Sequence, residues 1–132
     1  MNFPEPYMSL FNASSRAVKD VDRHIKIGGP ATMQLNYLTY FVKECERRNI
    51  SYDFVSSHMY PNDGMCPGAS QPPIGVGGWN PDCFAALVKN ARQLLPADKP
   101  LYLTEYLTTA DKSLRRKSLK MIHLTGILNM FK

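Results

Sequence analysis

The stretch LYLTEYLTT, residues 101–109, places a glutamate at the end of a short apolar run. Its residues alternate as in a β-strand, so Leu101, Leu103 and Glu105 are predicted to share one face. A carboxylate on a face that two leucines mark as buried is costly unless it is paired or functional. Glu105 is therefore a candidate nucleophile or general base. The alternative is a buried ion pair with a lysine or arginine on an adjacent strand.

Three further side chains could serve the same chemistry. His58, in YDFVSSHMYP, shares its parity with Phe54 and is expected to point inward at its strand end, or else to bond a backbone carbonyl in the core. Tyr60 could donate its hydroxyl to a neighbouring carboxylate, or cover the edge of the core. Trp79 follows a run of glycines and could stack on the C–H face of a sugar, or anchor its loop to the body.

No metal or cofactor site is predicted. The three histidines fall on different elements, and no His, Cys and carboxylate cluster has ligand spacing. A phosphate loop of the Gly-Lys-Ser/Thr type is absent from the sequence. The cysteines, Cys45, Cys66 and Cys83, are expected to be free thiols, and a Cys66–Cys83 bridge is the alternative because both flank one long loop.

Composition limits the class of protein. A chain of 132 residues with 44% apolar content is enough for one modest domain with a core. The net charge of +5 is concentrated in DKSLRRKSLK, residues 111–120, which is typical of a solvated helix face, so nucleic-acid binding is not expected. The sequence has no signal segment and no apolar run of membrane length, so no membrane partner is expected. Compartment and oligomeric state stay open.

The elements that must position these residues alternate along the chain. Apolar residues recur at helical spacing over 7–21, at Leu10, Ala13, Ala17 and Val21. The stretch HIKIGGP then predicts a short strand that ends at Gly28-Gly29-Pro30. Next come a helix over 33–49, a strand over 52–60, a Gly/Pro-rich loop over 61–79, a helix over 81–95, a strand over 101–106 and a helix over 111–131.

This alternation predicts an α/β fold of parallel strands joined by crossover helices. Three strands fit either a small doubly wound sheet or a segment of an eight-stranded α/β barrel. In both architectures function collects at the carboxyl ends of the strands. The predicted ends are Gly28-Gly29-Pro30, His58-Met59-Tyr60 and Thr104-Glu105-Tyr106.

Three stretches taken together, SSRAVKDVDRHIKIGGPAT, ISYDFVSSHMYP and KPLYLTEYLTT, resemble glycoside hydrolase family 39 in order and spacing. That family contains β-xylosidases and α-L-iduronidases, and the motifs look nearer to the xylosidase branch. The likeness covers residues 7–107, and the tail 108–132 diverges. It implies that residues 1–132 are part of a catalytic (β/α)8 TIM barrel, with strands five to seven and their flanking helices.

The resemblance also implies a mechanism. Members of the family cleave glycosides with retention, using one glutamate as nucleophile and another as acid and base. The nucleophile's Thr-Glu motif matches Glu105, and the His-x-Tyr motif that lines the sugar site matches His58 and Tyr60. The resemblance thus implies a carbohydrate substrate and no cofactor.

The chain departs from the family at the second carboxyl group. The acid/base glutamate of the family lies in an Asn-Glu-Pro motif, which NFPEPY matches only superficially. Glu5 precedes Lys19 by 14 residues, about half the family's separation, so we reject Glu5 as the acid. Because three strands cannot close a barrel, we expect a fragment that is inactive alone. The alternatives are a non-catalytic carbohydrate-binding or interaction remnant, and a complete small domain with an incidental likeness.

Overall fold

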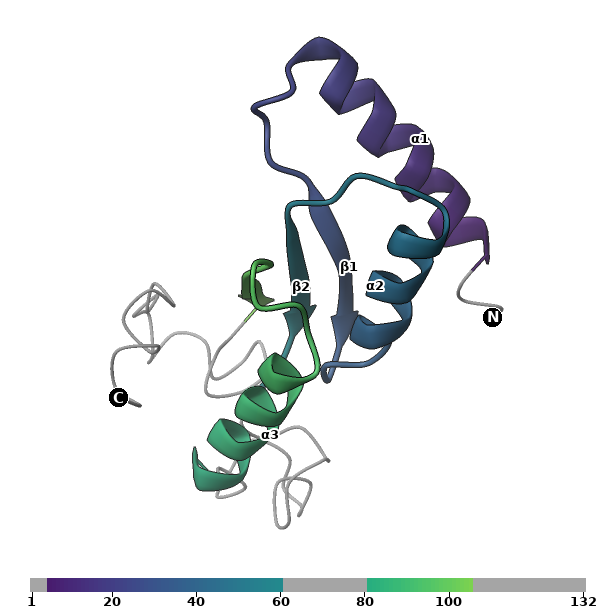
Figure 1. The fold of residues 1–132 in the computed structure, drawn as a ribbon. Coiled ribbons are helices and arrows are strands. Elements are labelled where there is room, and N and C mark those ends of the chain that lie inside the picture. The colour runs from purple at the N-terminus through teal and green to yellow at the C-terminus, as the bar shows by residue number, and fades with distance from the viewer. Residues whose placement is uncertain (1–4, 61–80, 106–132) are drawn as a thin grey trace, which may run out of the picture.

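The computed structural model describes residues 5–60 and 81–105. Trp79, the loop 61–79 and the helix predicted over 111–131 therefore lie outside the described residues. The elements are α1 (Glu5–Val21), β1 (Gly28–Met33), α2 (Leu38–Arg47), β2 (Phe54–His58), α3 (Pro81–Gln93) and β3 (Leu101–Glu105), as Figure 1 shows.

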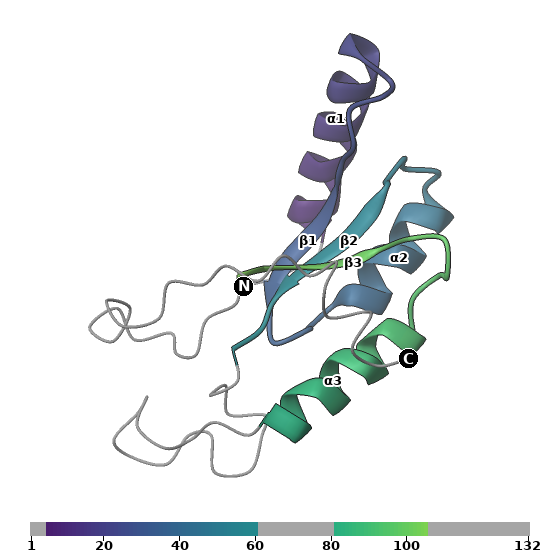
Figure 2. The ribbon, with the colours of Figure 1, turned by 90° about the vertical axis from the view of Figure 1, so that its left-hand side faces the viewer.

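The strands form one parallel sheet in the order β1-β2-β3. Helices α2 and α3, which connect successive strands, lie on the same side of the sheet (Figure 2). Parallel neighbours joined by right-handed crossovers place both helices on one face when the strand order follows the sequence. The predicted α/β class is confirmed, and the described sheet is wound in one direction only.

The main core lies between this face of the sheet and the helices. Val55 of β2 is fully buried and clusters with α2 residues, among which Phe41 is also fully buried. The Phe41 ring meets Phe11 of α1 edge to face at 4.9 Å and Tyr52 at 5.7 Å between centroids. Burying one such side chain contributes about 1.5–3 kcal/mol. One aromatic cluster therefore joins α1, α2 and the segment that leads into β2.

The buried stripe of α1 differs from the predicted one. Met8, Phe11 and Ser15 are buried, whereas Leu10 is 66% and Val21 is 83% exposed. A serine fits the buried face because its hydroxyl donates a 2.6 Å hydrogen bond to a backbone carbonyl, that of Ser51. Hydrophobicity alone could not identify this stripe.

The first strand was also predicted in the wrong place, because Gly28-Gly29-Pro30 begins β1 instead of ending it. A Cβ on Gly28 would overlap the Phe54 carbonyl oxygen, so glycine here permits close approach of two strands. Pro30 lacks an N–H, which an outer strand of the described sheet tolerates. The carboxyl end of β1 therefore lies at Met33, and α2 begins only at Leu38.

The cysteines differ from each other. Cys45 is a free, buried thiol, and burial raises its pKa to about 12. Cys83 is disulfide-bonded, so the expectation of free thiols is wrong for this residue. Within the described residues, no helix combines the length and hydrophobicity that crossing a bilayer requires.

Candidate active site

A β-bulge at the end of β3 decides where Glu105 points. Ser57 pairs with Leu103, but the next residue of β2, His58, pairs with Glu105, so Thr104 is an extra residue. Paired residues of parallel strands share a face, and a bulge re-aims the side chains that follow it. Glu105 therefore leaves the leucine face and joins the face of His58. The predicted alternation was wrong at this residue.

A second bulge lies on the other side of β2. Pro30 pairs with Ser56 and Thr32 with Ser57, which leaves Ala31 as the extra residue, with φ of 57°. Both outer strands of the described sheet thus shift register next to Ser57, β1 between its partners Ser56 and Ser57 and β3 between Ser57 and His58. Bulges are enriched next to active sites, where they orient side chains.

Ser57 ties the ends of these strands together. Its side chain is fully buried, and its hydroxyl donates to the Thr32 carbonyl at 2.5 Å and accepts from the Leu35 N–H at 3.1 Å. Its backbone carbonyl accepts a 3.2 Å hydrogen bond from the Thr104 hydroxyl. One residue therefore fixes the strand ends on both sides of His58.

Glu105 is contacted by the two residues that the sequence singled out. The Tyr60 hydroxyl donates a 2.5 Å hydrogen bond to its Oε2, and Nε2 of His58 lies 4.0 Å from its Oε1. The other ring nitrogen, Nδ1, lies 3.1 Å from the Thr104 hydroxyl oxygen. The side chain of Glu105 is 55% exposed and that of His58 is 22% exposed. The predicted hydroxyl-to-carboxylate contact of Tyr60 is confirmed.

This arrangement suits nucleophilic chemistry better than a packing role. A phenol holds one carboxylate oxygen, while the other faces an imidazole on the exposed side of the sheet. A hydrogen-bonded carboxylate that remains accessible can attack or bind an electropositive carbon. Two residues of the site, Ser57 and Thr104, were missed. The threonine beside the glutamate was visible in the sequence, but its contacts depend on the bulge.

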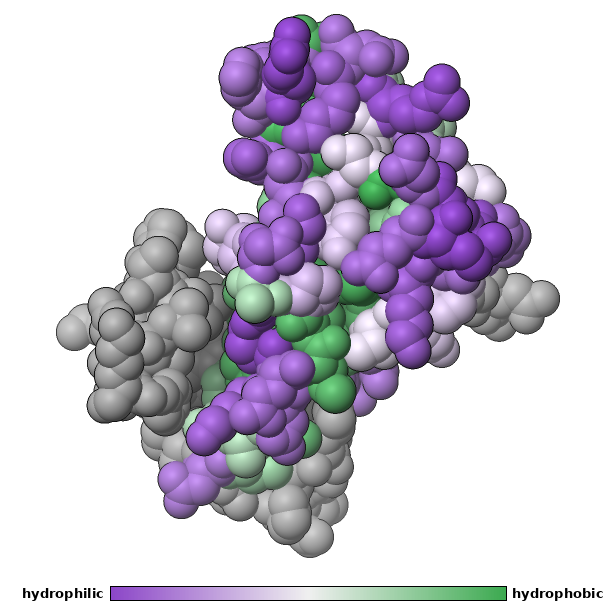
Figure 3. Space-filling view, viewed as in Figure 1, coloured by the Kyte–Doolittle hydropathy of each residue, from purple (hydrophilic) through white to green (hydrophobic). Residues whose placement is uncertain are grey.

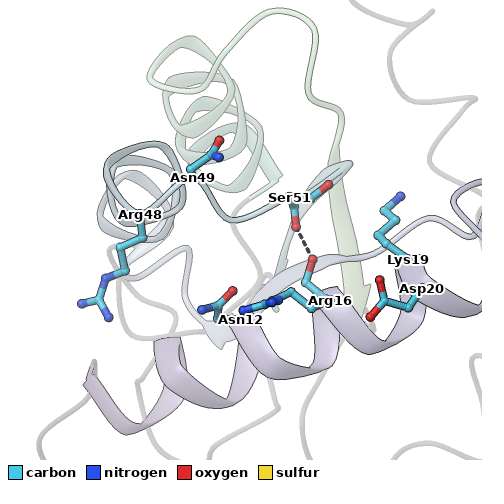
Figure 4. Close-up of a pocket in the computed structure, with 8 residues that line it drawn as sticks. Asn12, Arg16, Lys19, Asp20, Arg48, Asn49 and Ser51 are labelled. Atoms are coloured by element: carbon cyan, nitrogen blue, oxygen red, sulfur yellow. Dashed lines mark hydrogen bonds between the residues drawn. The ribbon is translucent and has the colours of Figure 1, made fainter.

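A cavity of about 400 Å³ lies elsewhere, between α1 and the segment that joins α2 to β2 (Figure 4). Lys19 on its wall binds Asp53 at 2.7 Å, and Arg48 binds the Glu5 carboxylate with both nitrogens of its fork. These cations already have partners, and the cavity is near the amino end of β2, far along the strand from His58. We assign it no ligand.

Apolar surface gathers between α2 and α3, as Figure 3 shows. The groove there is lined by Leu35, Leu38, Ala91 and Leu94 among others. It lies on the helix side of the sheet, whereas Glu105 faces the opposite side. No group of three or more His, Cys or carboxylate side chains in the described part of the chain is placed to hold a metal.

Comparison with known proteins assigns the class. The profile of glycosyl hydrolases family 39 matches residues 2–119, so the chain belongs to this family. It is 40% identical over 58 residues to a β-xylosidase of Geobacillus stearothermophilus, a stretch that covers 42% of this chain and 12% of that protein. A β-xylosidase of Caldicellulosiruptor saccharolyticus is 34% identical over 59 residues, 45% of this chain and 12% of that protein.

Solved structures agree with this assignment. A monomeric β-xylosidase from Caulobacter crescentus CB15 matches with a TM-score of 0.63 and 27% identity, over 80% of this chain and 22% of that one. A family 39 enzyme from Xanthomonas axonopodis pv. citri matches with a TM-score of 0.63 and 23% identity, over 81% of this chain and 22% of that one, and shows the fold alone. The chain thus spans about a fifth of these structures.

Proposed function

We propose that this chain carries the nucleophile part of a retaining glycosidase site of the β-xylosidase type, with Glu105 as nucleophile. The observation that carries the proposal is the bulge that turns Glu105 away from the core and onto the face of His58. There its Oε2 is held by Tyr60, and its Oε1 remains beside the imidazole. His58 and Tyr60 bind the sugar and orient the carboxylate, and Trp79 is a further proposed contact.

The same proposal includes the architecture. Residues 1–132 form part of one catalytic (β/α)8 barrel, in which β1, β2 and β3 are strands five, six and seven. It is supported by the strand order β1-β2-β3 with both connecting helices on one face, as successive barrel units require. The site then lies at the carboxyl ends of the strands, inside the barrel mouth.

The chemistry requires a second carboxyl group about 5–5.5 Å from the nucleophile. We assign that group to no residue of this chain. Glu5 begins α1 and is engaged by Arg48, an arginine that follows α2, so its carboxylate already serves as an ion-pair partner. Without a proton donor, the chain alone is expected to leave ordinary glycosides intact.

A substrate with a leaving group that needs no proton tests the nucleophile alone. A dinitrophenyl deoxyfluoro-β-xyloside reacts by attack of the Glu105 carboxylate on the anomeric carbon, which expels dinitrophenolate and forms a glycosyl ester. The fluorine beside the anomeric carbon slows hydrolysis of that ester, because it opposes the positive charge of the transition state. The proposal expects one equivalent of dinitrophenolate and a fluoroxylosyl group on the peptide that contains Glu105, detected by mass spectrometry.

Two variants make this test specific. Glu105→Gln removes the nucleophile with little change in shape and is expected to abolish labelling. Glu44→Gln is the matched control and is expected to leave labelling unchanged, because Glu44 pairs with Arg47 of α2 and with Arg48, which follows that helix. Labelling of the Glu105→Gln protein at the original rate, or on another residue, would exclude Glu105 as nucleophile.

A sugar-binding role without catalysis is the second candidate. It is favoured by the grouping of a carboxylate, an imidazole and a phenol, all of which hydrogen-bond to sugar hydroxyls. Calorimetric titration with xylose, xylobiose and iduronate derivatives separates the two. Heat of binding without labelling by the activated xyloside would support binding alone, and labelling would support the enzyme.

A further inference from the structure

The Thr104 hydroxyl contacts two groups that differ in hydrogen-bonding capacity. It is 3.2 Å from the Ser57 carbonyl oxygen and 3.1 Å from Nδ1 of His58. A hydroxyl has one proton to donate, and a carbonyl can only accept. Both contacts are satisfied only if Thr104 donates to Ser57 and accepts from a protonated Nδ1. The contact with the Ser57 carbonyl thus determines the direction of both hydrogen bonds of Thr104.

We propose that Thr104 is a positioning residue that selects the Nδ1–H tautomer of neutral His58, so that Nε2 becomes an acceptor for a sugar hydroxyl beside Glu105. The identity of the ligand rests on the proposed function. The choice of tautomer does not, because it follows from the hydrogen-bond geometry alone.

The geometry around Glu105 shows what this tautomer does. Nε2 of His58 and Oε1 of Glu105 are 4.0 Å apart, which is too far for a direct hydrogen bond. With Nδ1 protonated, both atoms are acceptors that face one gap, and Tyr60 already occupies the other carboxylate oxygen. A sugar hydroxyl can donate its proton to Nε2 while the anomeric carbon lies next to Oε1, the oxygen that the proposed attack requires. The opposite tautomer would place a proton in this gap and offer one acceptor fewer.

Ser57, which accepts the hydrogen bond from Thr104, is itself held in place. Ser57 is fully buried, and its own hydroxyl is tied to the Thr32 carbonyl and the Leu35 N–H. The bulge in β3 places Thr104 next to the Ser57 carbonyl and beside the His58 ring. The register shift thus orients Glu105 and also places Thr104 where it can select the tautomer of His58.

Nitrogen NMR of the imidazole ring in the full chain tests the proposal, since proton-bearing and bare ring nitrogens have well-separated shifts. In mildly alkaline buffer the His58 signals, assigned by their loss in His58→Gln, are expected to show Nδ1 protonated and Nε2 bare. Thr104→Val keeps the shape but removes the hydroxyl, and the ratio of the two tautomers is expected to change about fivefold towards Nε2–H, as one lost neutral hydrogen bond predicts. Thr104→Ser is expected to restore the original ratio.

Each outcome decides the question. An Nε2–H majority in the unmodified chain overturns the proposal, as does an unchanged ratio in Thr104→Val. Spectra of the unmodified protein are informative even if the valine variant fails to fold. An Nδ1–H ring in a chain that the activated xyloside does not label would leave Thr104 in its role and remove the catalytic proposal. Labelling of a chain in which His58 carries its proton on Nε2 would support Glu105 as nucleophile and remove the role that we propose for Thr104.

Discussion

The Tyr60 phenol donates a 2.5 Å hydrogen bond to Oε2 of Glu105, joining the ends of two neighbouring strands. A carboxylate held at one oxygen has a fixed plane, so its second oxygen is presented in one direction. Here Oε1 is the oxygen on the side of His58. The role of nucleophile that we propose for Glu105 requires such preorganisation.

Tyr60→Phe is expected to slow labelling by the activated xyloside roughly 10- to 100-fold, the equivalent of one hydrogen bond to a charged group. The phenyl ring preserves the packing, so the loss reflects the hydroxyl. The rate is measured from release of dinitrophenolate. Tyr52→Phe is the matched control, since Tyr52 is a buried tyrosine of the core that packs on Phe41. Equal rates in the two variants would remove Tyr60 from the site.

Ser57→Ala is expected to destabilise the protein by about 1–3 kcal/mol, because it leaves the part-buried Thr32 carbonyl and Leu35 N–H without their hydroxyl partner. Ser56 is the matched control. It is also buried, at 3% exposure, and no side-chain hydrogen bond to another described residue is found for it. Urea unfolding of both variants should give a loss for Ser56→Ala of less than about 1 kcal/mol. Similar losses would contradict the bridging role.

Periodicity and turn chemistry predicted most of the fold. The strands at Phe54–His58 and Leu101–Glu105 and the helix from Pro81 were found because alternation, and a proline at the first helical position, are local signals. The strand at Gly28 was not, since glycine beside proline is also the signature of a turn. Its actual use, close approach to Phe54, depends on a residue far along the chain.

The candidate site was predicted in part for the same reason. Glu105, His58 and Tyr60 follow from strand ends and from the family resemblance. The face of Glu105 and the contributions of Ser57 and Thr104 depend on cross-strand register, which changes at two bulges. A bulge leaves no periodic trace in one sequence, because it is defined by the pairing of two strands.

Gly28→Ala tests the close approach of β1 and β2. The new methyl group would overlap the Phe54 carbonyl oxygen, a backbone atom that cannot move without shifting the strand. Overpacking of this kind is expected to cost about 1–3 kcal/mol in urea unfolding. In Gly29→Ala the methyl group meets the far end of a side chain, the Tyr7 hydroxyl, and not the backbone of the neighbouring strand, so a smaller loss is expected. A larger loss at Gly29 would refute the assignment.

Asp53 at the amino end of the sheet is expected to make stability pH-dependent. Burial acts to raise the pKa of its carboxyl group, but hydrogen bonds from Lys19 at 2.7 Å, the Ile27 N–H at 2.9 Å and Lys26 outweigh this effect and leave the pKa below its ordinary value. A carboxyl whose folded pKa is depressed contributes stability above its unfolded pKa, about 3.9, and loses that contribution as pH falls through the folded value.

Asp53→Asn should therefore reduce the free energy of unfolding by roughly 1–3 kcal/mol at neutral pH, and the difference from the unmodified protein should shrink below about pH 4. Urea unfolding over a pH series measures this difference. Hydrogen bonds from Arg47 and Arg48 lower the pKa of Glu44 to about 2. Glu44 is present in both proteins, so its titration cancels in the difference between them. Asp20→Asn is the control, because Asp20 is exposed and should change stability by less than about 0.5 kcal/mol. A difference that persists undiminished in acid would show that Asp53 stabilises the fold by packing and not by charge.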